Sequence, residues 1–464
     1  MKDNRRILLE KRVKKEVEKA VVRGFNLLAE EKGEEFQVED GVSLHIATAC
    51  GGIYIGPKEL EEKVICGAVI DSRLVEQDYL FIPIKGERVD GHTFIEQVFE
   101  KGACCVLSEQ ELDAPKGPYI KVDSTELALK QIAKFYRQGL DIKVVGITGS
   151  VGKTSTKEMI ASVLGVKFNT LKTAGNFNNE VGLPLTVFNI KEEHEAAVLE
   201  MGISDFGEMH RLSKVARPNI CVITNIGFCH LEFLGDRDGV LRAKSEIFDF
   251  AADGAKAIVN GDDDKLRTLK SREDLNVTLF GMDEFNDVYA KNVENLGLDG
   301  LKCDISTPVG DFSAHIHIPG MHMVYNALAG TCVGLACGLT LEEIKSGIEN
   351  AQTISGRNNI IHTENYTIMD DCYNANPVSM KASLDVLATA LGRKVAILGD
   401  MGELGTDERA LHYTVGEHAS EKNIDLLLCV GTLSEEIVKG AKEKNPEMNA
   451  VLFENKEELL EKLP

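Results

Sequence analysis

The sequence predicts an α/β protein of three domains, with a doubly wound sheet in the central one. At 464 residues the chain exceeds the roughly 250–300 residues that a single hydrophobic core serves. Apolar strand patterns alternate with helical patterns from residue 141 to about residue 355, which is typical of a mainly parallel sheet with helices on both faces. Shorter α/β patterns lie on either side of this region, over residues 45–140 and 356–464.

The N-terminal regions give weaker signals. Residues 1–44 are dense in charge and carry apolar residues at helical intervals, so they predict an amphipathic helical extension. In residues 45–140 the apolar runs are short and interrupted by glycine, which predicts a small mixed α/β domain. One of these runs ends in Asp71-Ser72-Arg73. Polar residues at a strand end suit ligand contacts, but ordinary surface turns have the same composition, so both interpretations stay open.

A glycine-rich loop between a strand and a helix is the most informative stretch. Apolar residues at 144–147 predict a buried strand, and the spacing of apolar residues over 159–164 predicts a helix that ends at Gly165. The pattern T-G-S-x-G-K-T between them lets backbone N–H groups and a helix N-terminus face an anion, while the lysine adds charge and the threonine hydroxyl can bind Mg²⁺. We therefore expect a nucleoside triphosphate as ligand. The residues of this phosphate loop are Gly149, Ser150, Val151, Gly152, Lys153, Thr154 and Ser155.

Polar residues also follow the next predicted strands. Glu200 comes directly after a run at 196–199, and His230 follows a run at 220–224. Because ligands of open α/β sheets bind at the carboxyl ends of strands, both can face the same triphosphate. Lys244 lies on the apolar face of the next predicted helix. Such a lysine usually extends its amine to water; the alternative is a metal-site lysine, carbamylated because a bare ammonium would repel Mg²⁺.

Composition limits the classes of function. A formal net charge of −22 argues against nucleic-acid binding, which needs a basic face. No stretch approaches the roughly 18 apolar residues of a membrane helix, and no apolar core of a secretory signal follows the basic N-terminus. Eleven cysteines without C-x-x-C pairs predict reduced thiols rather than disulfides or a zinc site. We expect a cytoplasmic protein without membrane insertion.

The last region contains two further sequence motifs. They are D-D-C-Y-N-A-N-P at residues 370–377 and L-G-D-M-G-E-L-G at residues 398–405. Together with the phosphate loop, G-N-F-N-N-E at residues 175–180 and R-A-K at residues 242–244, they resemble the Mur ligase family over most of the chain. The phosphate loop is common to that family and its folate-ligase relatives. The two stretches of the last region are similar to the branch that adds D-alanyl-D-alanine.

The resemblance implies a UDP-sugar domain (residues 45–140), a central ATPase domain (141–355) and a C-terminal Rossmann-like domain for the amino substrate (356–464). It implies ATP and Mg²⁺ as cofactors, with Lys153 and the loop amides on the phosphates and Lys153, His230 and Lys244 as catalytic residues. It also implies metal, nucleotide and substrate contacts. These are Thr154, Glu200, His230 and carbamylated Lys244 at Mg²⁺; Asn326 at adenine; Arg357 and Asp371 at the γ-phosphate and ribose; Asp71, Ser72 and Arg73 at the uridine nucleotide; and Asn178 and Asn179 at the substrate.

The implied reaction is ATP-dependent amide formation between D-alanyl-D-alanine and UDP-N-acetylmuramoyl-tripeptide, through an acyl phosphate, by a monomer in peptidoglycan precursor synthesis. One alternative is another ligase of the family that adds a single amino acid. A second is an ATP-binding subunit completed by a partner, because the sequence stops at residue 464 where members usually continue into a further strand and helix. A P-loop GTPase is disfavoured because the N-K-x-D motif is absent.

Overall fold

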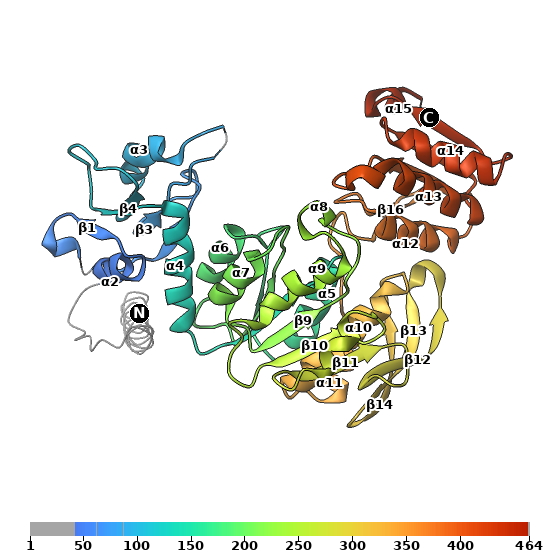
Figure 1. Ribbon diagram of the computed structural model, residues 1–464, viewed down its shortest axis with the longest axis horizontal. Coiled ribbons are helices and arrows are strands. Elements are labelled where there is room, and N and C mark those ends of the chain that lie inside the picture. Colours follow the sequence, from blue (N-terminus) through green and yellow to red (C-terminus); the bar gives the residue numbers. More distant parts are fainter. Residues whose placement is uncertain (1–41, 62, 87, 463–464) are drawn as a thin grey trace.

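The computed structural model describes residues 42–61, 63–86 and 88–462. Within them the chain forms three α/β units that follow one another in sequence order, from the N-terminal unit in blue through the green and yellow central unit to the red C-terminal unit (Figure 1). The expected helical extension at residues 1–44 falls outside the described residues except for its last three positions, where helix α2 (Val42–Ala49) begins. The α/β class with three units agrees with the sequence-based prediction.

The first unit is a five-stranded sheet in the order β1-β5-β4-β3-β2. Its strands are parallel except for β1, which pairs antiparallel to β5. The short apolar runs become its core, where Leu80, Cys105 and Leu107 are fully buried. Its elements are β1 (Ile53–Ile55), β2 (Gly67–Val69), β3 (Tyr79–Phe81), β4 (Cys105–Ser108), β5 (Tyr119–Lys121), and helices α2, α3 (Ile95–Glu100) and α4 (Thr125–Gln138).

The central unit is a nine-stranded sheet in the order β14-β13-β12-β11-β10-β9-β6-β8-β7. Neighbouring residues of its strands point to opposite faces, so Val145 packs in one core cluster and Val144 in another. Helices α5, α10 and α11 cover the first face, and α6, α7 and α9 cover the second, which confirms the doubly wound arrangement. The strands are β6 (Lys143–Thr148), β7 (Thr170–Lys172), β8 (Ala196–Glu200), β9 (Ile220–Ile223), β10 (Lys256–Asn260), β11 (Asn276–Gly281), β12 (Val288–Asn295), β13 (Leu301–Thr307) and β14 (Gly310–Ile316). The helices are α5 (Lys153–Gly165), α6 (Gly182–Phe188), α7 (Glu208–Ala216), α8 (Leu231–Leu234), α9 (Arg237–Ser245), α10 (His322–Ala336) and α11 (Leu341–Glu349).

The parallel order of this sheet ends at β12. Strands β7 to β12 pair in parallel, whereas β12, β13 and β14 follow one another directly and pair antiparallel. A helix-covered parallel core with an antiparallel edge is a frequent form of doubly wound sheet. The carboxyl ends of β6, β8 and β9 therefore lie side by side, and their loops form one edge of the sheet.

Helix α4 joins the first two units. Its residues pack in the core of the first unit, and it also carries Arg137, which is 6% exposed. The Arg137 guanidinium donates to the carbonyls of Ala216 at 3.0 Å and Arg217 at 3.3 Å in the central unit, and burial lowers its pKa to about 10. The first two units are thus held together by a buried cation whose hydrogen bonds are satisfied.

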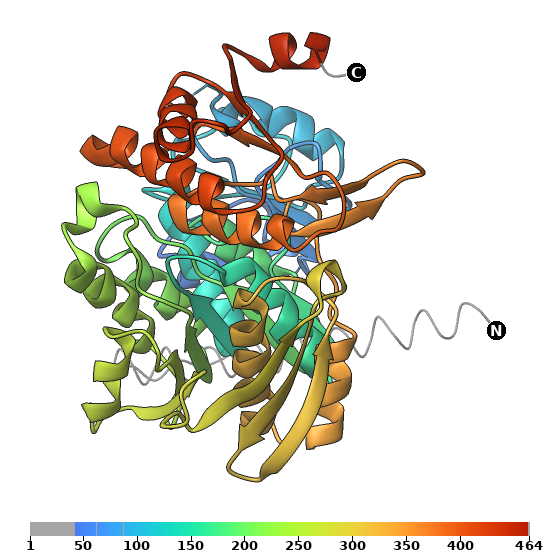
Figure 2. The same ribbon diagram turned by 90° about the vertical axis from the view of Figure 1, so that its right-hand side faces the viewer.

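The C-terminal unit begins with an antiparallel hairpin, which projects from the molecule in Figure 2. A three-stranded parallel sheet in the order β17-β18-β19 follows, with a core centred on Leu427, Val415 and Ile437. Its elements are β15 (Asn359–His362), β16 (Thr367–Asp370), α12 (Pro377–Ala388), β17 (Val395–Gly399), α13 (Glu408–Glu421), β18 (Leu426–Val430), α14 (Ser434–Lys444), β19 (Ala450–Phe453) and α15 (Lys456–Lys462).

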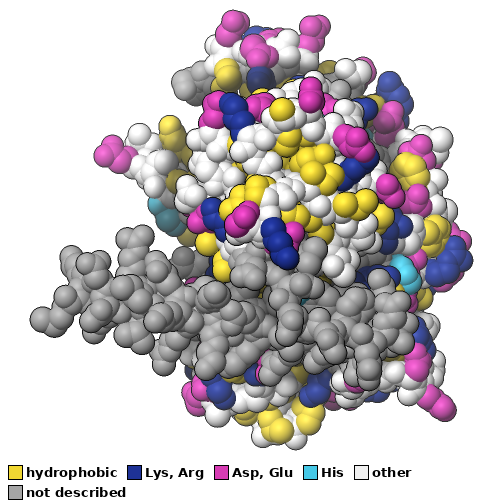
Figure 3. Space-filling model, turned by 90° about the vertical axis from the view of Figure 1, so that its left-hand side faces the viewer, with side chains coloured by type: hydrophobic (Ala, Val, Ile, Leu, Met, Phe, Trp, Pro, Cys, Tyr) yellow, Lys and Arg dark blue, Asp and Glu magenta, His cyan; other side chains and the backbone are white. Residues whose placement is uncertain are grey.

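The surface carries charge of both signs. On the part of the face in Figure 3 that is coloured by type, acidic and basic side chains surround small groups of hydrophobic ones. None of the described helices combines the length and the apolar character needed to cross a membrane. All eleven cysteines are free thiols, and Cys104, Cys105 and Cys332 are among the buried ones.

Candidate active site

The phosphate loop connects β6 to α5 as predicted. Gly149 has a φ of +150°, and a Cβ atom there would lie 1.9 Å from Thr224 Oγ1, so this position requires glycine. Gly152, with φ of +81°, caps α5. The first N–H groups of α5 have no acceptor within the helix, and they open toward the loop together with the positive end of the helix dipole. Lys153 Nζ donates to the Gly149 carbonyl at 2.9 Å, and burial lowers the pKa of Lys153.

The loop after β9 holds the phosphate loop in place through Asn225. Asn225 Oδ1 accepts the Val151 N–H at 2.9 Å, and its Nδ2 donates to the Val151 carbonyl at 2.9 Å. The Ser150 N–H donates to the Asn225 carbonyl at 3.1 Å, and Ser150 Oγ accepts the Gly227 N–H at 2.8 Å. The N–H groups of Ser150 and Val151, expected to face an anion, are therefore engaged by Asn225. The amides that remain for an anion are those of Gly149 and the first turn of α5.

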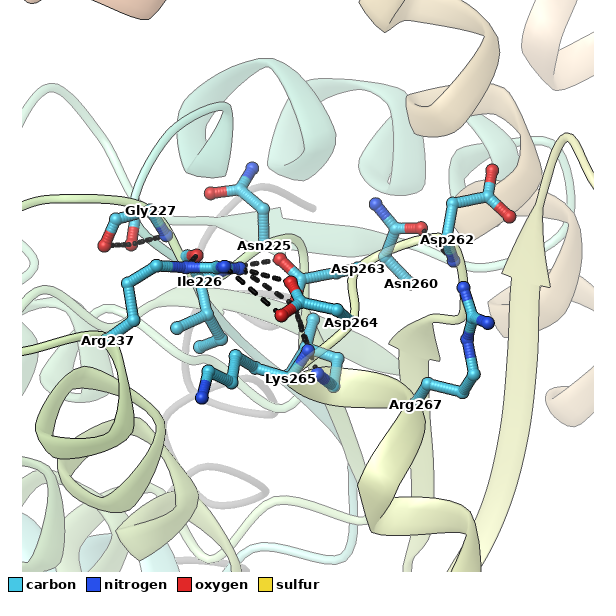
Figure 4. Close-up of polar contacts among 12 residues, drawn as sticks. Asn225, Ile226, Gly227, Arg237, Asn260, Asp262, Asp263, Asp264, Lys265 and Arg267 are labelled. Atoms are coloured by element: carbon cyan, nitrogen blue, oxygen red, sulfur yellow. Dashed lines mark hydrogen bonds and ion pairs between the residues drawn. The ribbon is translucent and has the colours of Figure 1, made fainter.

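A second layer of charge supports this loop. Asp263 Oδ2 accepts the Ile226 N–H at 2.8 Å, and Arg237 Nε donates to the Ile226 carbonyl at 2.8 Å. Arg237 also forms an ion pair with Asp264 at 2.6 Å, and this pair lies beside Ile226 (Figure 4). Asp262, Asp263 and Asp264 follow β10 in the chain. Asp263 and, through Arg237, Asp264 support the loop after β9, which in turn holds the phosphate loop by hydrogen bonds.

Glu200 ends β8 at the same edge and is 2% exposed. Its Oε1 accepts from Asn178 Nδ2 at 2.8 Å and from Thr154 Oγ1 at 3.3 Å. Its Oε2 is buried without a hydrogen-bond partner and lies 3.8 Å from Lys157 Nζ, which donates to the Thr173 carbonyl at 2.7 Å. A buried carboxylate oxygen left without a donor, next to a threonine hydroxyl, fits a cation ligand site.

His230 and Lys244 also lie at this edge. His230 caps α8 with φ of +51°, and its pKa is lowered by burial and then by the positive charges of Lys244 and Lys153. Lys244 is 1% exposed, so its amine does not extend to water. Burial, with the charge of Lys153, lowers the pKa of Lys244 to about 7. Within the described part of the chain, no three His, Cys, Asp or Glu side chains form a ready metal cluster.

The residues expected at adenine, the γ-phosphate and ribose come from α10 of the central unit and from two loops of the C-terminal unit. Asn326 lies on α10, is 6% exposed, and its Oδ1 accepts from Thr156 Oγ1 of α5 at 2.7 Å. The Arg357 guanidinium lies 4.4 Å from the centre of the Tyr373 ring, and its charge acts on Lys153. Asp371 accepts the Asn358 N–H at 3.1 Å and also a hydrogen bond from Ser383 Oγ.

The expected substrate contacts divide between two sheets. Asp71 and Arg73 follow β2 of the first sheet and pair with each other at 2.7 Å, which lowers the pKa of Asp71 to about 2. Lys101 Nζ donates to the Ser72 carbonyl at 2.8 Å. Asn179 Oδ1 accepts the Gly182 N–H at 2.8 Å and so supports the start of α6. Of these residues only Asn178 joins the phosphate-loop edge, through Glu200.

Several residues of this edge escape prediction from sequence. Lys157, Asn225 and Asp263 carry no motif of their own, although the spacing of Lys157 four residues after Lys153 places both on one side of α5. Glu403, from the loop after β17, reaches to 4.0 Å from His230 Nδ1 and comes from another unit of the protein. Only the fold brings these side chains to the phosphate loop.

Known proteins resemble this chain in sequence and in structure. Three family models match: the Mur ligase family catalytic domain over residues 65–137, the Mur ligase middle domain over 147–334 and the Mur ligase glutamate ligase domain over 356–463. The chain is 40% identical over 402 residues to the UDP-N-acetylmuramoyl-tripeptide–D-alanyl-D-alanine ligase of Bacillus subtilis, covering 86% of each protein. The chain belongs to the Mur ligase family. It is an ATP-dependent amide-forming ligase by that membership.

Solved structures of Mur ligases agree with the assignment. The crystal structure of MurF from Acinetobacter baumannii matches with a TM-score of 0.82 and 34% identity, over 91% of both chains. The MurF ligase of Thermotoga maritima in complex with ADP matches with a TM-score of 0.73 and 29% identity, over 85% of this chain and 96% of that one.

Proposed function

We propose that this Mur ligase joins D-alanyl-D-alanine to the terminal carboxylate of UDP-N-acetylmuramoyl-tripeptide at the expense of ATP, as a step of peptidoglycan precursor synthesis. One observation carries the choice of substrates: the 40% identity, over 86% of both proteins, to a relative named for this reaction. The domains proposed for the work are residues 45–140 for the UDP-sugar, 141–355 for ATP and 356–464 for the amine. We propose a cytoplasmic monomer, without nucleic-acid or membrane partners.

The phosphate-loop edge supports ATP as the co-substrate. A carboxylate and an amine do not condense in water, because the carboxylate is a poor electrophile. Transfer of the γ-phosphoryl group to the carboxylate gives an acyl phosphate with phosphate as leaving group, but it sets one anion against another. Lys153, the first amides of α5 and the helix dipole supply the positive potential that this approach requires. Arg357, whose charge acts on Lys153, would add to it at the γ-phosphate.

The donor set fits Mg²⁺. Thr154 Oγ1 and the unpartnered Oε2 of Glu200 would hold one ion, since hard divalent cations prefer oxygen ligands. His230 and Lys244 would hold a second. With a pKa of about 7, part of Lys244 is a free amine at neutral pH, and its nitrogen can attack CO₂, lose a proton and become an anionic carbamate. Bound Mg²⁺ would neutralise charge on the phosphate oxygens.

The remaining residues would bind the ends of the substrates. Asn326 would face adenine, although its Oδ1 is engaged by Thr156 in this structure. Asp371 would contact the ribose. Asp71, Ser72 and Arg73 follow a strand of the first sheet and would contact the uridine nucleotide. Asn178 would act at the phosphate end through Glu200, and Asn179 beside it would keep the turn in shape.

Phosphate release from Mg-ATP tests the proposal. We expect release that requires both UDP-N-acetylmuramoyl-tripeptide and D-alanyl-D-alanine, and a loss of at least about 100-fold in Lys153→Ala. Mass spectrometry of the product should find the dipeptide amide. Release with a single amino acid in place of the dipeptide would instead assign the chain to another branch of the family. No release with any pair of substrates would contradict the proposal.

A further inference from the structure

We propose that Glu403 binds the ammonium group of the incoming amine substrate and thereby sets the affinity for that substrate. The inference rests on the ligase reaction proposed above. An α-amino group with a pKa of about 8 is mostly protonated in neutral water, so D-alanyl-D-alanine arrives as a cation at its reacting end. It must be placed beside an acyl phosphate, where the protein supplies mainly positive charge.

The charges already described at this place repel such a substrate. Lys153 carries a positive charge, and the Arg357 guanidinium acts on Lys153 from the C-terminal unit. These groups suit phosphate, but two like charges a few ångströms apart disfavour each other by an amount comparable to the attraction of an ion pair. A carboxylate free to face the ammonium is therefore needed at the boundary between the phosphate site and the amine site.

Most carboxylates near this boundary are engaged. Glu200 accepts from Asn178 and Thr154, and Asp371 accepts from Asn358 and Ser383. Asp370 accepts from Gly356, Asp400 from Ser434, and Glu208 from Ser204, whereas Glu232 of α8 is exposed and belongs to the central unit.

Glu403 differs from the hydrogen-bonded carboxylates Asp370, Asp400 and Glu208. Its side chain is 84% exposed, and its contact in the structure is His230 Nδ1 at 4.0 Å, which is longer than a hydrogen bond. The carboxylate thus lies beside a residue of the phosphate-loop edge while keeping its acceptor positions open to a ligand.

The loop that carries Glu403 is built as a fixed support. It follows β17, at the carboxyl end of a parallel strand, where ligands of such sheets bind. Met401, 1% exposed, anchors it in the core, and the Met401 N–H donates to His412 Nε2 at 2.9 Å. Asp400, the residue before Met401, adds a second anchor by accepting from Ser434 N–H and Oγ, both at 2.7 Å.

The backbone of Glu403 is strained. Its φ of +58° lies in the left-handed region, which is unfavourable for a residue with a Cβ. Gly402 precedes Glu403, and Gly405 lies two residues after it. A glycine at position 403 itself would adopt this φ without strain. His230, on the facing side, has a φ of +51°. Strained non-glycine residues that meet across two units are typical of functional contacts.

Steady-state kinetics of Glu403→Gln test the proposal. The variant keeps the shape of the side chain and removes its charge. We expect the KM for D-alanyl-D-alanine to rise about tenfold, which equals about 1.4 kcal/mol, while the KM values for ATP and for UDP-N-acetylmuramoyl-tripeptide change less than about twofold. The matched control is Glu447→Gln, an exposed glutamate of the same unit on the turn before β19, which should leave all three KM values unchanged.

An analogue without the amine separates charge recognition from shape. Propionyl-D-alanine has the dipeptide skeleton but no ammonium group, and we expect its inhibition constant to be the same for the wild-type enzyme and Glu403→Gln. The proposal would be overturned if the inhibition constant of the analogue rose as much as the KM for the dipeptide. It would also be overturned if the KM for ATP rose as much as the KM for the dipeptide. Either result would indicate that Glu403 supports the contact between the two units. An unchanged KM for the dipeptide would overturn it too. Inactivity of the wild-type enzyme with the dipeptide would instead contradict the proposed function.

Discussion

Lys244 is the residue whose burial conflicts most with its charge. Folding lowers its pKa from 10.5 to about 7, so between those pH values the unfolded chain binds one proton more than the folded chain. Stability contributed by this group therefore rises with pH across that window, and below about pH 7 the buried ammonium destabilises the fold fully. We expect Lys244→Met to raise Tm by about 5 °C at pH 6 in carbonate-free buffer, with the gain shrinking toward pH 10. A gain that does not vary with pH would contradict the buried charge.

The same residue is expected to act as an anion once carbamylated. Lys244→Ala should lower kcat about 100-fold, because an anionic oxygen is lost from the metal site. Added formate or acetate should restore part of the activity by supplying a carboxylate in the vacated space. Lys153→Ala is the control, since its loss removes a cation that no carboxylate replaces. Rescue of both variants, or of neither, would contradict a carbamate at Lys244.

Sequence reasoning at the residue scale reached the groups that carry recognisable chemistry. The phosphate loop, Glu200 and His230 all follow strands whose carboxyl ends share one edge, so their proximity could be predicted from the alternation of elements. Lys244 could be placed on an apolar helix face, but the sequence left open whether its amine extends to water or lies in the metal site. Its exposure of 1% in the structure excludes the first alternative. Asn225 follows the run at 220–224 and could be placed at this edge, but its bonding to Val151, 74 residues away, could not be predicted. Glu403 could not be placed, because its partner lies in another unit.

At the scale of elements, the loop after β9 determines the shape of the phosphate loop. Asn225→Ala would leave the N–H and the carbonyl of Val151 without their partners. We expect the KM for ATP to rise about tenfold and the free energy of unfolding to fall by about 1–3 kcal/mol. Asn350→Ala is the matched control, because its Nδ2 donates to a backbone carbonyl on an exposed helix end. Equal effects of the two changes on the KM for ATP would contradict the role of the β9 loop.

The elements themselves were largely predictable from apolar spacing. The strand expected at residues 144–147 is β6, which runs from Lys143 to Thr148, and the strand expected at 196–199 is β8, extended by Glu200. Less predictable was the antiparallel end of the central sheet, since β12, β13 and β14 follow each other without a helix. Their alternation suits a strand in either direction, and direction depends on the connections made in the folded protein.

At the scale of the whole molecule, the C-terminal unit meets the central one through α12, which lies against residues 297–299, and through polar contacts. Asn358 Nδ2 lies 3.0 Å from His322 Nε2, and Glu403 lies 4.0 Å from His230. Chemistry through an acyl phosphate requires exclusion of water, so we expect the C-terminal unit to close over bound ligands. Small-angle X-ray scattering should record a smaller radius of gyration with UDP-N-acetylmuramoyl-tripeptide and a non-hydrolysable ATP analogue together. Lys153→Ala should not contract with the same ligands, and an unchanged radius for the unaltered protein would contradict closure.

Isotope transfer tests the central claim most directly. With both oxygens of the tripeptide's terminal carboxylate labelled with ¹⁸O, one of them becomes the bridging oxygen when the γ-phosphoryl group is transferred. It leaves with phosphate when the amine attacks. The account predicts one ¹⁸O atom in each phosphate released and one in the new amide, measured by mass spectrometry in the presence of D-alanyl-D-alanine. Label in AMP, or released phosphate free of ¹⁸O, would contradict phosphoryl transfer to the substrate carboxylate.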